Sequence, residues 1–415
     1  MTAAPDQSAA GASGAGVTSG AVPSGAWRAL VVATLVFTTT FWAWGLLSPL
    51  AADYRDQLSL APVQVSLLVA VPVILGSITR VALGALTDRF GGRLVFTVLS
   101  LAVVAPLLLL TVFESYPLLL LGALLLGVSG ASFAVGIPFV SGWFPPERRG
   151  TALGIYGIGN LGTAIAAFTT QPLASATSRA GVFLFVAAIM VATSALAWFV
   201  GRNAPSWQPQ TVPMATRLRT ALRLRVTVDL AALYAITFGG FVAFGVYLPT
   251  YLQEIYGLTA ADSAARAGGF ILLATLSRPV GGILSDRIGA PRVLATALAV
   301  VGVGAIVVAF ELALPAATVA FLAVAAALGV GNGAVFALVG RRSPADAVGA
   351  VTGFVGAAGG LGGFLPPLVM GAVFQATGSY AIGLMLLSNV AFAGLVYTAW
   401  RFLTDARTEN VPGLS

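Results

Sequence analysis

Residues 80–93 have the sequence RVALGALTDRFGGR, and residues 278–289 have the related sequence RPVGGILSDRIG. In each copy an Arg is followed by Gly four residues later and by an Asp-Arg pair eight residues later. Further along each half, GTALGIYGIGNLG at 150–162 is echoed by GAVTGFVGAAGGLG at 349–362. These paired stretches predict a chain of two related halves, an arrangement typical of many secondary transporters.

Composition places this duplicated chain in a membrane. Of its 415 residues 58% are hydrophobic and only 8% are charged, with a mean hydropathy of +0.96. A soluble protein carries roughly a quarter charged residues, so this chain has too little charge to cover a water-facing surface. It has no Cys, His or Lys, which argues against metal sites, acid–base enzymes and a Gly-xxxx-Gly-Lys phosphate loop. We therefore expect neither an enzyme nor a bound cofactor or metal.

Twelve apolar stretches are each long enough to cross a bilayer as a helix, which takes roughly 20 residues. An all-α protein is therefore predicted. The polar segment 202–227 separates the first six stretches from the last six, which gives two bundles at 27–201 and 228–401. Residues 1–26 are expected to be a disordered tail and 402–415 a second tail, while Arg217 to Arg225 are expected to form a basic surface helix. The predicted spans are 27–50, 63–86, 94–112, 116–143, 150–174, 180–201, 228–252, 264–285, 293–313, 316–340, 347–373 and 379–401.

The arginines predict the orientation in the membrane. With the N-terminus inside, sixteen of the 21 Arg fall in cytoplasmic segments, and only Arg55, Arg179 and Arg266 fall outside. Positive charge favours the cytoplasmic side, so both termini are predicted to be cytoplasmic in a multi-pass protein of the cell inner membrane. This distribution accounts for the basic pI without a nucleic-acid partner. We expect a monomer with the lipid bilayer as its surroundings.

Two arginines remain inside the membrane, and they are the candidate binding residues. Arg80 and Arg278 each lie two turns before a cytoplasmic Asp, roughly 12 Å deep at 1.5 Å per residue. Burying such a charge costs several kcal/mol unless it faces a cavity or a partner, and no carboxylate is expected at that depth. The symmetry of the halves predicts that the two arginines face each other and bind a small, planar anion.

The cytoplasmic Asp-Arg pairs and the membrane glycines have other predicted roles. Asp88 with Arg89 and Arg93, and Asp286 with Arg287, are expected to latch the inner side by pairing with neighbouring helix ends. Asn160 supplies an amide within the membrane that can donate a hydrogen bond to an anion. The glycines expected to let helices approach closely are Gly157, Gly159, Gly162, Gly356, Gly359 and Gly362.

The 84–93 loop resembles that of the major facilitator superfamily. The two membrane arginines with the glycine runs further resemble the nitrate/nitrite porter family, over nearly all of residues 27–401. That resemblance implies that Arg80 and Arg278 clamp the anion, that Asn160 bonds it, and that aromatic rings cover its plane. The candidate rings are Phe133, Tyr234 and Phe238.

The chain also departs from that family. Ala131 stands where many relatives have Asn, and Gly359-Gly360 stands where an Asn would mirror Asn160, so a thinner polar lining is expected.

The sequence thus predicts alternating-access transport of nitrate or nitrite, by exchange or by nitrate–proton symport. An empty site would hold two like charges, which repel by roughly 2 kcal/mol at about 8 Å and a dielectric near 20, and this favours exchange. The alternatives are a transporter of another small anion, a drug exporter on the same scaffold, or a nitrate sensor. A sensor would need a signalling domain, for which the polar segments are too short.

Overall fold

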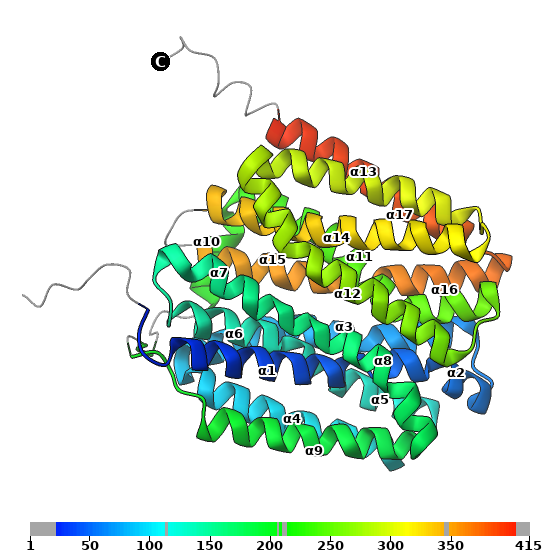
Figure 1. Ribbon diagram of the computed structural model, residues 1–415, viewed down its shortest axis with the longest axis horizontal. Coiled ribbons are helices and arrows are strands. Elements are labelled where there is room, and N and C mark those ends of the chain that lie inside the picture. Colours follow the sequence, from blue (N-terminus) through cyan, green and yellow to red (C-terminus); the bar gives the residue numbers. More distant parts are fainter. Residues whose placement is uncertain (1–21, 113–114, 206, 210–213, 344–347, 404–415) are drawn as a thin grey trace, which may run out of the picture.

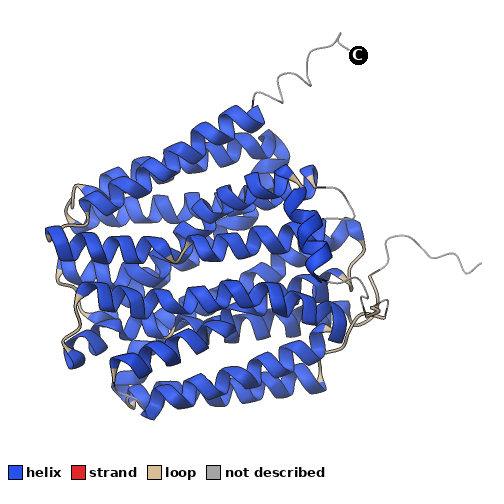
Figure 2. Cartoon of the chain, turned by 180° about the vertical axis from the view of Figure 1, so that it is seen from behind, coloured by secondary structure: helices blue, strands red, loops and turns tan. Residues whose placement is uncertain are grey.

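The computed structural model describes residues 22–112, 115–205, 207–209, 214–343 and 348–403. Within them the chain is helical with short connections, and no strand occurs (Figure 2). The helices are α1 (Ala26–Gly45), α2 (Leu47–Leu58), α3 (Pro62–Phe90), α4 (Gly92–Val112), α5 (Tyr116–Leu126), η1 (Gly127–Ala131), α6 (Ser132–Ser141), α7 (Pro146–Gly157), η2 (Ile158–Asn160), α8 (Leu161–Ala176), α9 (Arg179–Phe199), α10 (Met214–Arg223), α11 (Arg225–Tyr256), α12 (Ala260–Leu284), η3 (Ser285–Gly289), α13 (Ala290–Ala309), α14 (Leu314–Arg342), α15 (Val348–Gly362), α16 (Leu365–Thr377), α17 (Ala381–Thr398) and η4 (Ala399–Leu403).

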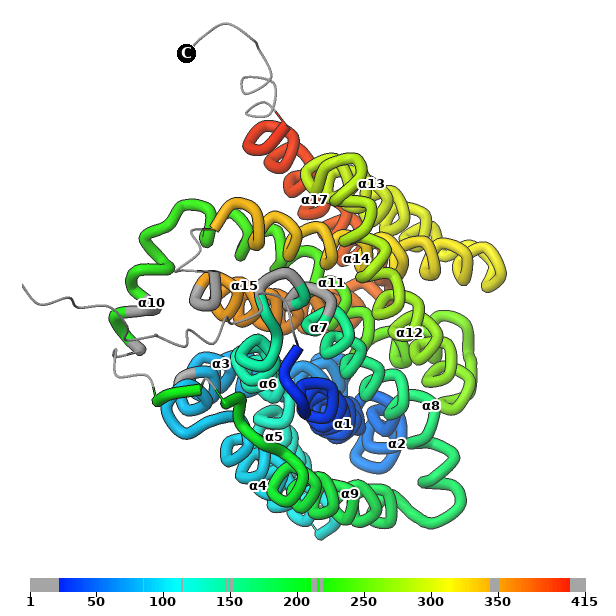
Figure 3. Tube along the Cα trace, turned by 60° about the vertical axis from the view of Figure 1, so that its left-hand side comes forward, coloured from blue at the N-terminus to red at the C-terminus, as the bar shows by residue number. Residues whose placement is uncertain are grey.

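The helices form two bundles, α1–α9 and α11–α17, which lie side by side in Figures 1 and 3. Helix α10, in the segment that joins the bundles, lies at one end of them (Figure 3). By length and hydropathy, 11 continuous stretches of the described residues can cross a membrane. One of these, Ala260–Ala309, contains both α12 and α13, so the described chain has the twelve crossings that the sequence predicts.

Several crossings are interrupted halfway. The fourth consists of α5, a 3₁₀ turn and α6, and the fifth of α7, a 3₁₀ turn and α8. At the first interruption the backbone of Gly127 approaches the carbonyl of Pro72 on α3 so closely that a Cβ atom would collide with it. The eleventh crossing is divided between α15 and α16. The breaks in the fourth and eleventh crossings lie next to Arg80, because Gly130 accepts a hydrogen bond from it and a Cβ atom at Gly360 would collide with it. Irregular backbone of this kind can approach a ligand.

The observed helices differ from the predicted spans mainly in where they end. The first crossing continues through α2 to Leu58, and the seventh extends to Tyr256, because both helices project beyond their apolar cores. The predicted basic helix is present as α10, and the last crossing ends at Leu403. The proposed tails lie mostly outside the described residues, which begin at 22 and end at 403.

The two ends of the molecule differ in how the bundles meet. We call the end that carries α10 and the described chain ends the linker end, and the opposite end, which carries α2, the far end (Figure 1). At the far end Ser48 of α2 donates a hydrogen bond to the carbonyl of Val246 on α11. The pocket that these two residues line together with Ala167 is narrow, with a volume of about 20 Å³. The far end is therefore closed.

Candidate anion-binding site

Arg80 projects from the middle of α3 into the space between the bundles and is buried. Its Nε donates to the carbonyl of Gly130, 3.1 Å away, and its Nη1 donates to the carbonyl of Gly356, 2.9 Å away. Gly130 lies in the broken fourth crossing and Gly356 in α15 of the other bundle. Two backbone carbonyls orient this guanidinium without neutralising it, so the positive charge remains available to an anion.

Arg278 lies at the matching position of α12 in the second bundle. Its guanidinium carbon lies 5.2 Å from the ring centre of Phe238 and 4.8 Å from that of Phe241. Its Nε and Nη2 atoms are buried and have no hydrogen-bond partner among the described residues. The ion pairs found in the described chain involve other arginines, so neither Arg80 nor Arg278 has a carboxylate partner there.

Phe238 brings the two arginines to one place. The guanidinium carbon of Arg80 lies 5.6 Å from the centre of the same ring that Arg278 contacts. Tyr234, one turn earlier on α11, stacks on Phe238 with a centroid separation of 5.0 Å and an interplanar angle of 4°. The ring centre of Phe133 also lies close to Arg80, at 6.0 Å from its guanidinium carbon. The structure therefore gathers the three predicted aromatic residues around the two arginines.

Asn160 is buried at the break between α7 and α8. Its Nδ2 donates to the carbonyl of Gly157 at 2.9 Å, whereas its Oδ1 has no partner. One of the two amide hydrogens is thus already used, which leaves this residue fewer donors for an anion than the sequence alone indicates. Tyr156, which lies one turn before Asn160 and was not predicted from the sequence, stacks its ring on that of Phe133.

The glycines of α15 allow the second bundle to reach the site. A Cβ atom at Gly359 would collide with the ring of Tyr234, and one at Gly360 would collide with Ser77 and Arg80. Gly159, Gly162 and Gly362 are packed as closely against neighbouring helices. Gly356 makes only ordinary contact with Phe133, at 3.5 Å. Gly157 departs from the packing prediction, because no heavy atom of a neighbour lies within 4 Å of its Cβ position, and its carbonyl serves Asn160 instead.

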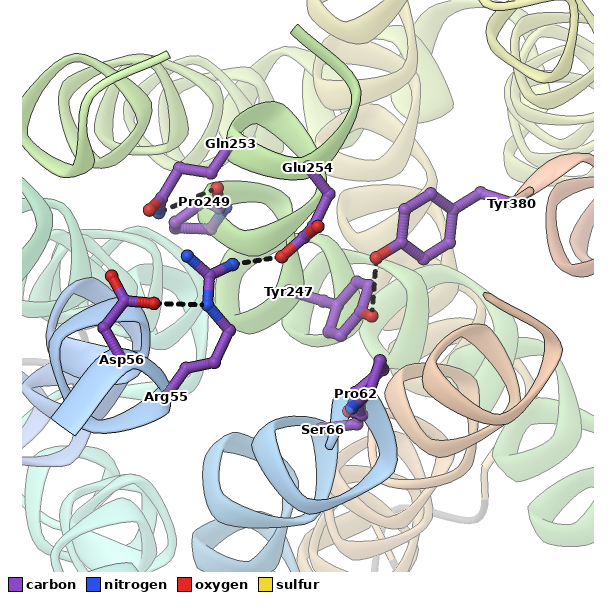
Figure 4. A network of polar contacts seen from close by, with 9 residues as sticks. All are labelled: Arg55, Asp56, Pro62, Ser66, Tyr247, Pro249, Gln253, Glu254 and Tyr380. Atoms are coloured by element: carbon purple, nitrogen blue, oxygen red, sulfur yellow. Dashed lines mark hydrogen bonds and ion pairs between the residues drawn. The ribbon is translucent and has the colours of Figure 1, made fainter. Parts of the chain in front are cut away.

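Arg55 and Glu254 connect the bundles at the far end (Figure 4). Arg55, on α2, forms an ion pair with Glu254 of α11 and a second one, at 2.9 Å, with its neighbour Asp56. They line a polar cavity of about 450 Å³, which also includes Tyr247 and Tyr380. The hydroxyls of these tyrosines share a hydrogen bond of 3.0 Å. Arg55 is predicted from the sequence to lie outside the membrane, but its pairing with Glu254 is apparent only in the structure.

The predicted latch residues at the linker end contact their own bundles. Arg93 donates to the carbonyl of Trp198 at 2.9 Å and stacks on its indole ring, and Asp286 pairs with Arg341 at 2.6 Å. Arg89 lies over the ring of its neighbour Phe90, and Arg287 is exposed. Asp88 lines a cavity of about 190 Å³ with the first residues of the joining segment. The contacts of Arg93 and Asp286 each stay within one bundle, in contrast to the pair Arg55–Glu254 at the far end.

Two homologous bundles that enclose a cationic, aromatic-lined site between them define a membrane transport protein. The sequence-family model of the Major Facilitator Superfamily matches this chain over residues 33–367 and again over residues 264–414. The chain belongs to this superfamily and, within it, to the nitrate/nitrite porter family, as its curated relatives indicate.

Three of these relatives span most of the chain. The "Probable nitrate/nitrite transporter NarK2" of Mycobacterium tuberculosis is 46% identical over 381 residues, covering 89% of this chain and 95% of the relative. The "Nitrite extrusion protein" of Bacillus subtilis is 38% identical, covering 90% and 94%. The "Probable nitrate transporter NarT" of Staphylococcus carnosus is 36% identical, covering 91% and 97%.

A solved structure supports the fold independently. A bacterial homolog of the human lysosomal transporter Spinster, in an inward-facing and occupied conformation, superposes with a TM-score of 0.70. It is 17% identical and covers 91% of this chain and 96% of its own, so the likeness concerns the fold alone. The chain is an all-α, multi-pass membrane transporter with the major facilitator fold, and not an enzyme.

Proposed function

We propose that this protein transports nitrate and nitrite across the cytoplasmic membrane by alternating access, with its linker end and both termini in the cytoplasm. The observation that carries this proposal is the pair Arg80 and Arg278, both within 6 Å of one phenyl ring and without a described carboxylate partner. A small anion is the ligand that supplies the missing charge. The family relationship selects the oxyanions of nitrogen among such ligands.

The lining fits a planar oxyanion. Guanidinium groups present N–H donors in a plane and match the oxygens of nitrate or nitrite. The rings of Phe133 and Phe238 both lie within about 6 Å of the Arg80 guanidinium carbon, so an anion held by Arg80 would have apolar ring surface beside it. Such rings exclude water, which strengthens the attraction between the anion and the arginines.

Charge also supports exchange as the mode of transport. The guanidinium carbons of Arg80 and Arg278 lie 5.6 and 5.2 Å from one ring centre and hence at most about 11 Å apart. At a dielectric near 20 their charges repel by roughly 1.5 kcal/mol or more, and one bound anion removes most of that cost. The bundles should therefore rock more easily with an anion bound than empty, which favours nitrate entry against nitrite exit. Nitrate–proton symport is the competing mode, with protons as a further partner. We propose that the transporting unit is a monomer, since the site is formed within one chain.

Uptake of labelled nitrate into proteoliposomes tests the substrate. Unlabelled nitrate and nitrite should compete with this uptake, whereas acetate and lactate, which carry an alkyl group, should not. The conservative change Arg80→Lys should abolish uptake, because an ammonium cannot bond both carbonyls and the anion in one plane. Uptake by Arg80→Lys at the wild-type rate, or competition by acetate as strong as by nitrite, would contradict the proposal.

A further inference from the structure

Asn332 is a buried amide that the sequence analysis passed over. It lies in α14 within Gly329-Val330-Gly331-Asn332-Gly333 and is 1% exposed. Neither its Nδ2 nor its Oδ1 has a hydrogen-bond partner. Burying a polar group without a partner costs free energy, and proteins rarely leave both ends of an amide unpaired. An unpaired donor and acceptor in a transporter interior point to a ligand.

The neighbours of Asn332 on α14 show which way it faces. Leu328 and Phe336, one turn before and after it, share its side of the helix. Phe336 meets the ring of Tyr234 edge-on at 5.0 Å, and Leu328 packs 3.1 Å from the Cβ position of Gly240 on α11. Asn332 therefore faces α11, at the segment that carries the aromatic rings of the anion site.

Helix α12 bounds the same space. A Cβ atom at Gly333 would collide with the backbone oxygen of Arg278, so the two helices are in backbone contact beside the arginine. Arg278 has two unpartnered nitrogen atoms, Nε and Nη2, and these are not bonded to Asn332. Unpartnered donors thus lie on the neighbouring helices α12 and α14, and those of Arg278 lie next to Phe238.

We propose that Asn332 is a substrate-binding residue of the second bundle, with Nδ2 donating to an oxygen of the bound anion. This inference rests on the proposed function and deepens it. Asn160 has already committed its Nδ2 to Gly157, so Asn332 is the freer of the two amide donors. Each bundle then contributes one arginine and one amide. The second bundle would therefore supply an amide to the site even though Gly359-Gly360 stands where an Asn would mirror Asn160.

Purified wild type, Asn332→Ala and Asn332→Ser are compared by nitrate-dependent thermal stabilisation in detergent and by nitrate uptake in proteoliposomes. The matched control is Asn389→Ala, since Asn389 is an exposed amide on α17. Loss of a hydrogen bond to a charged ligand should weaken the apparent nitrate affinity of Asn332→Ala by about ten- to a hundredfold. Asn332→Ser, which keeps a donor, should lose less, and Asn389→Ala should match wild type.

The melting temperature without nitrate separates binding from a structural role. Removing an unpartnered amide should leave that temperature unchanged or raise it, whereas removing a structural hydrogen bond would lower it. Wild-type nitrate affinity in Asn332→Ala, or a lowered melting temperature with unchanged affinity, would overturn this inference and leave the transport function standing. A wild-type protein that neither binds nor transports nitrate would instead overturn the proposed function.

Discussion

Cutting the ion pair between Arg55 and Glu254 should open the far end of the transporter. The pair joins α2 of one bundle to α11 of the other, and its side chains are 30% and 26% exposed. A partly exposed pair of this kind contributes about 1 kcal/mol after solvent screening. Because it exists only while the far end is closed, its loss should raise the far-end-open population about fivefold.

The chain contains no Cys, so one introduced thiol can report this opening. Ala167 lines the narrow pocket of about 20 Å³ together with Ser48 and Val246, where a maleimide cannot enter. In an Ala167→Cys background, labelling by an impermeant maleimide should be slow, and Glu254→Gln should accelerate it about fivefold. The charge exchange Arg55→Glu with Glu254→Arg should return the labelling rate toward that of the background.

Asp56→Asn is the matched control. Asp56 also pairs with Arg55, but it lies on the same helix and is 71% exposed, so its neutralisation breaks no contact between bundles. Its labelling rate should stay close to that of the background. Equal rates for Glu254→Gln and Asp56→Asn would refute the reasoning, because the ion pair between bundles would then contribute nothing to closure.

Two further predictions concern packing and stability. Gly360→Ala should reduce nitrate uptake at least tenfold, because its Cβ would collide with Arg80, whereas Gly353→Ala on the same helix, with no neighbour within 4 Å, should transport normally; equal uptake would contradict this packing role. Asp229→Asn should lower the free energy of unfolding by about 1–3 kcal/mol, since this carboxylate is 4% exposed and accepts from Tyr397 at 2.8 Å and Arg401 at 3.0 Å. Asp286→Asn, at an exposed pair, should cost less than about 1 kcal/mol. Thermal unfolding in detergent compares the two, and a larger loss for Asp286→Asn would be contrary to the burial argument.

Most of the fold follows from properties that act locally. Apolar length predicts each crossing, and the repeated Arg-Gly-Asp spacing relates the bundles, so twelve crossings can be derived without any distant contact. Arg80 and Arg278 are also found locally, because a charge within an apolar stretch needs an explanation wherever its neighbours lie. The broken crossings were missed, since the tight approach of Gly127 to Pro72 depends on a helix far away in sequence.

The details of the site depend on pairings that sequence patterns do not contain. Glu254 reads as an ordinary residue at a helix end until the fold brings it to Arg55, 199 residues away. Asn160 reads as a free amide until its turn places the Gly157 carbonyl within reach. Asn332 did have a local signal, an amide between glycines inside a membrane span. The same reasoning that selected Asn160 could have found it.

The central claim is that the bound anion supplies the charge that allows the bundles to rock. Uptake of labelled nitrate into proteoliposomes tests this directly when three interiors are compared: nitrite-loaded, anion-free, and anion-free with an imposed inward proton gradient. The account predicts rapid uptake with nitrite inside and little uptake in the other two cases. Rapid uptake with the proton gradient alone, and no stimulation by internal nitrite, would contradict it.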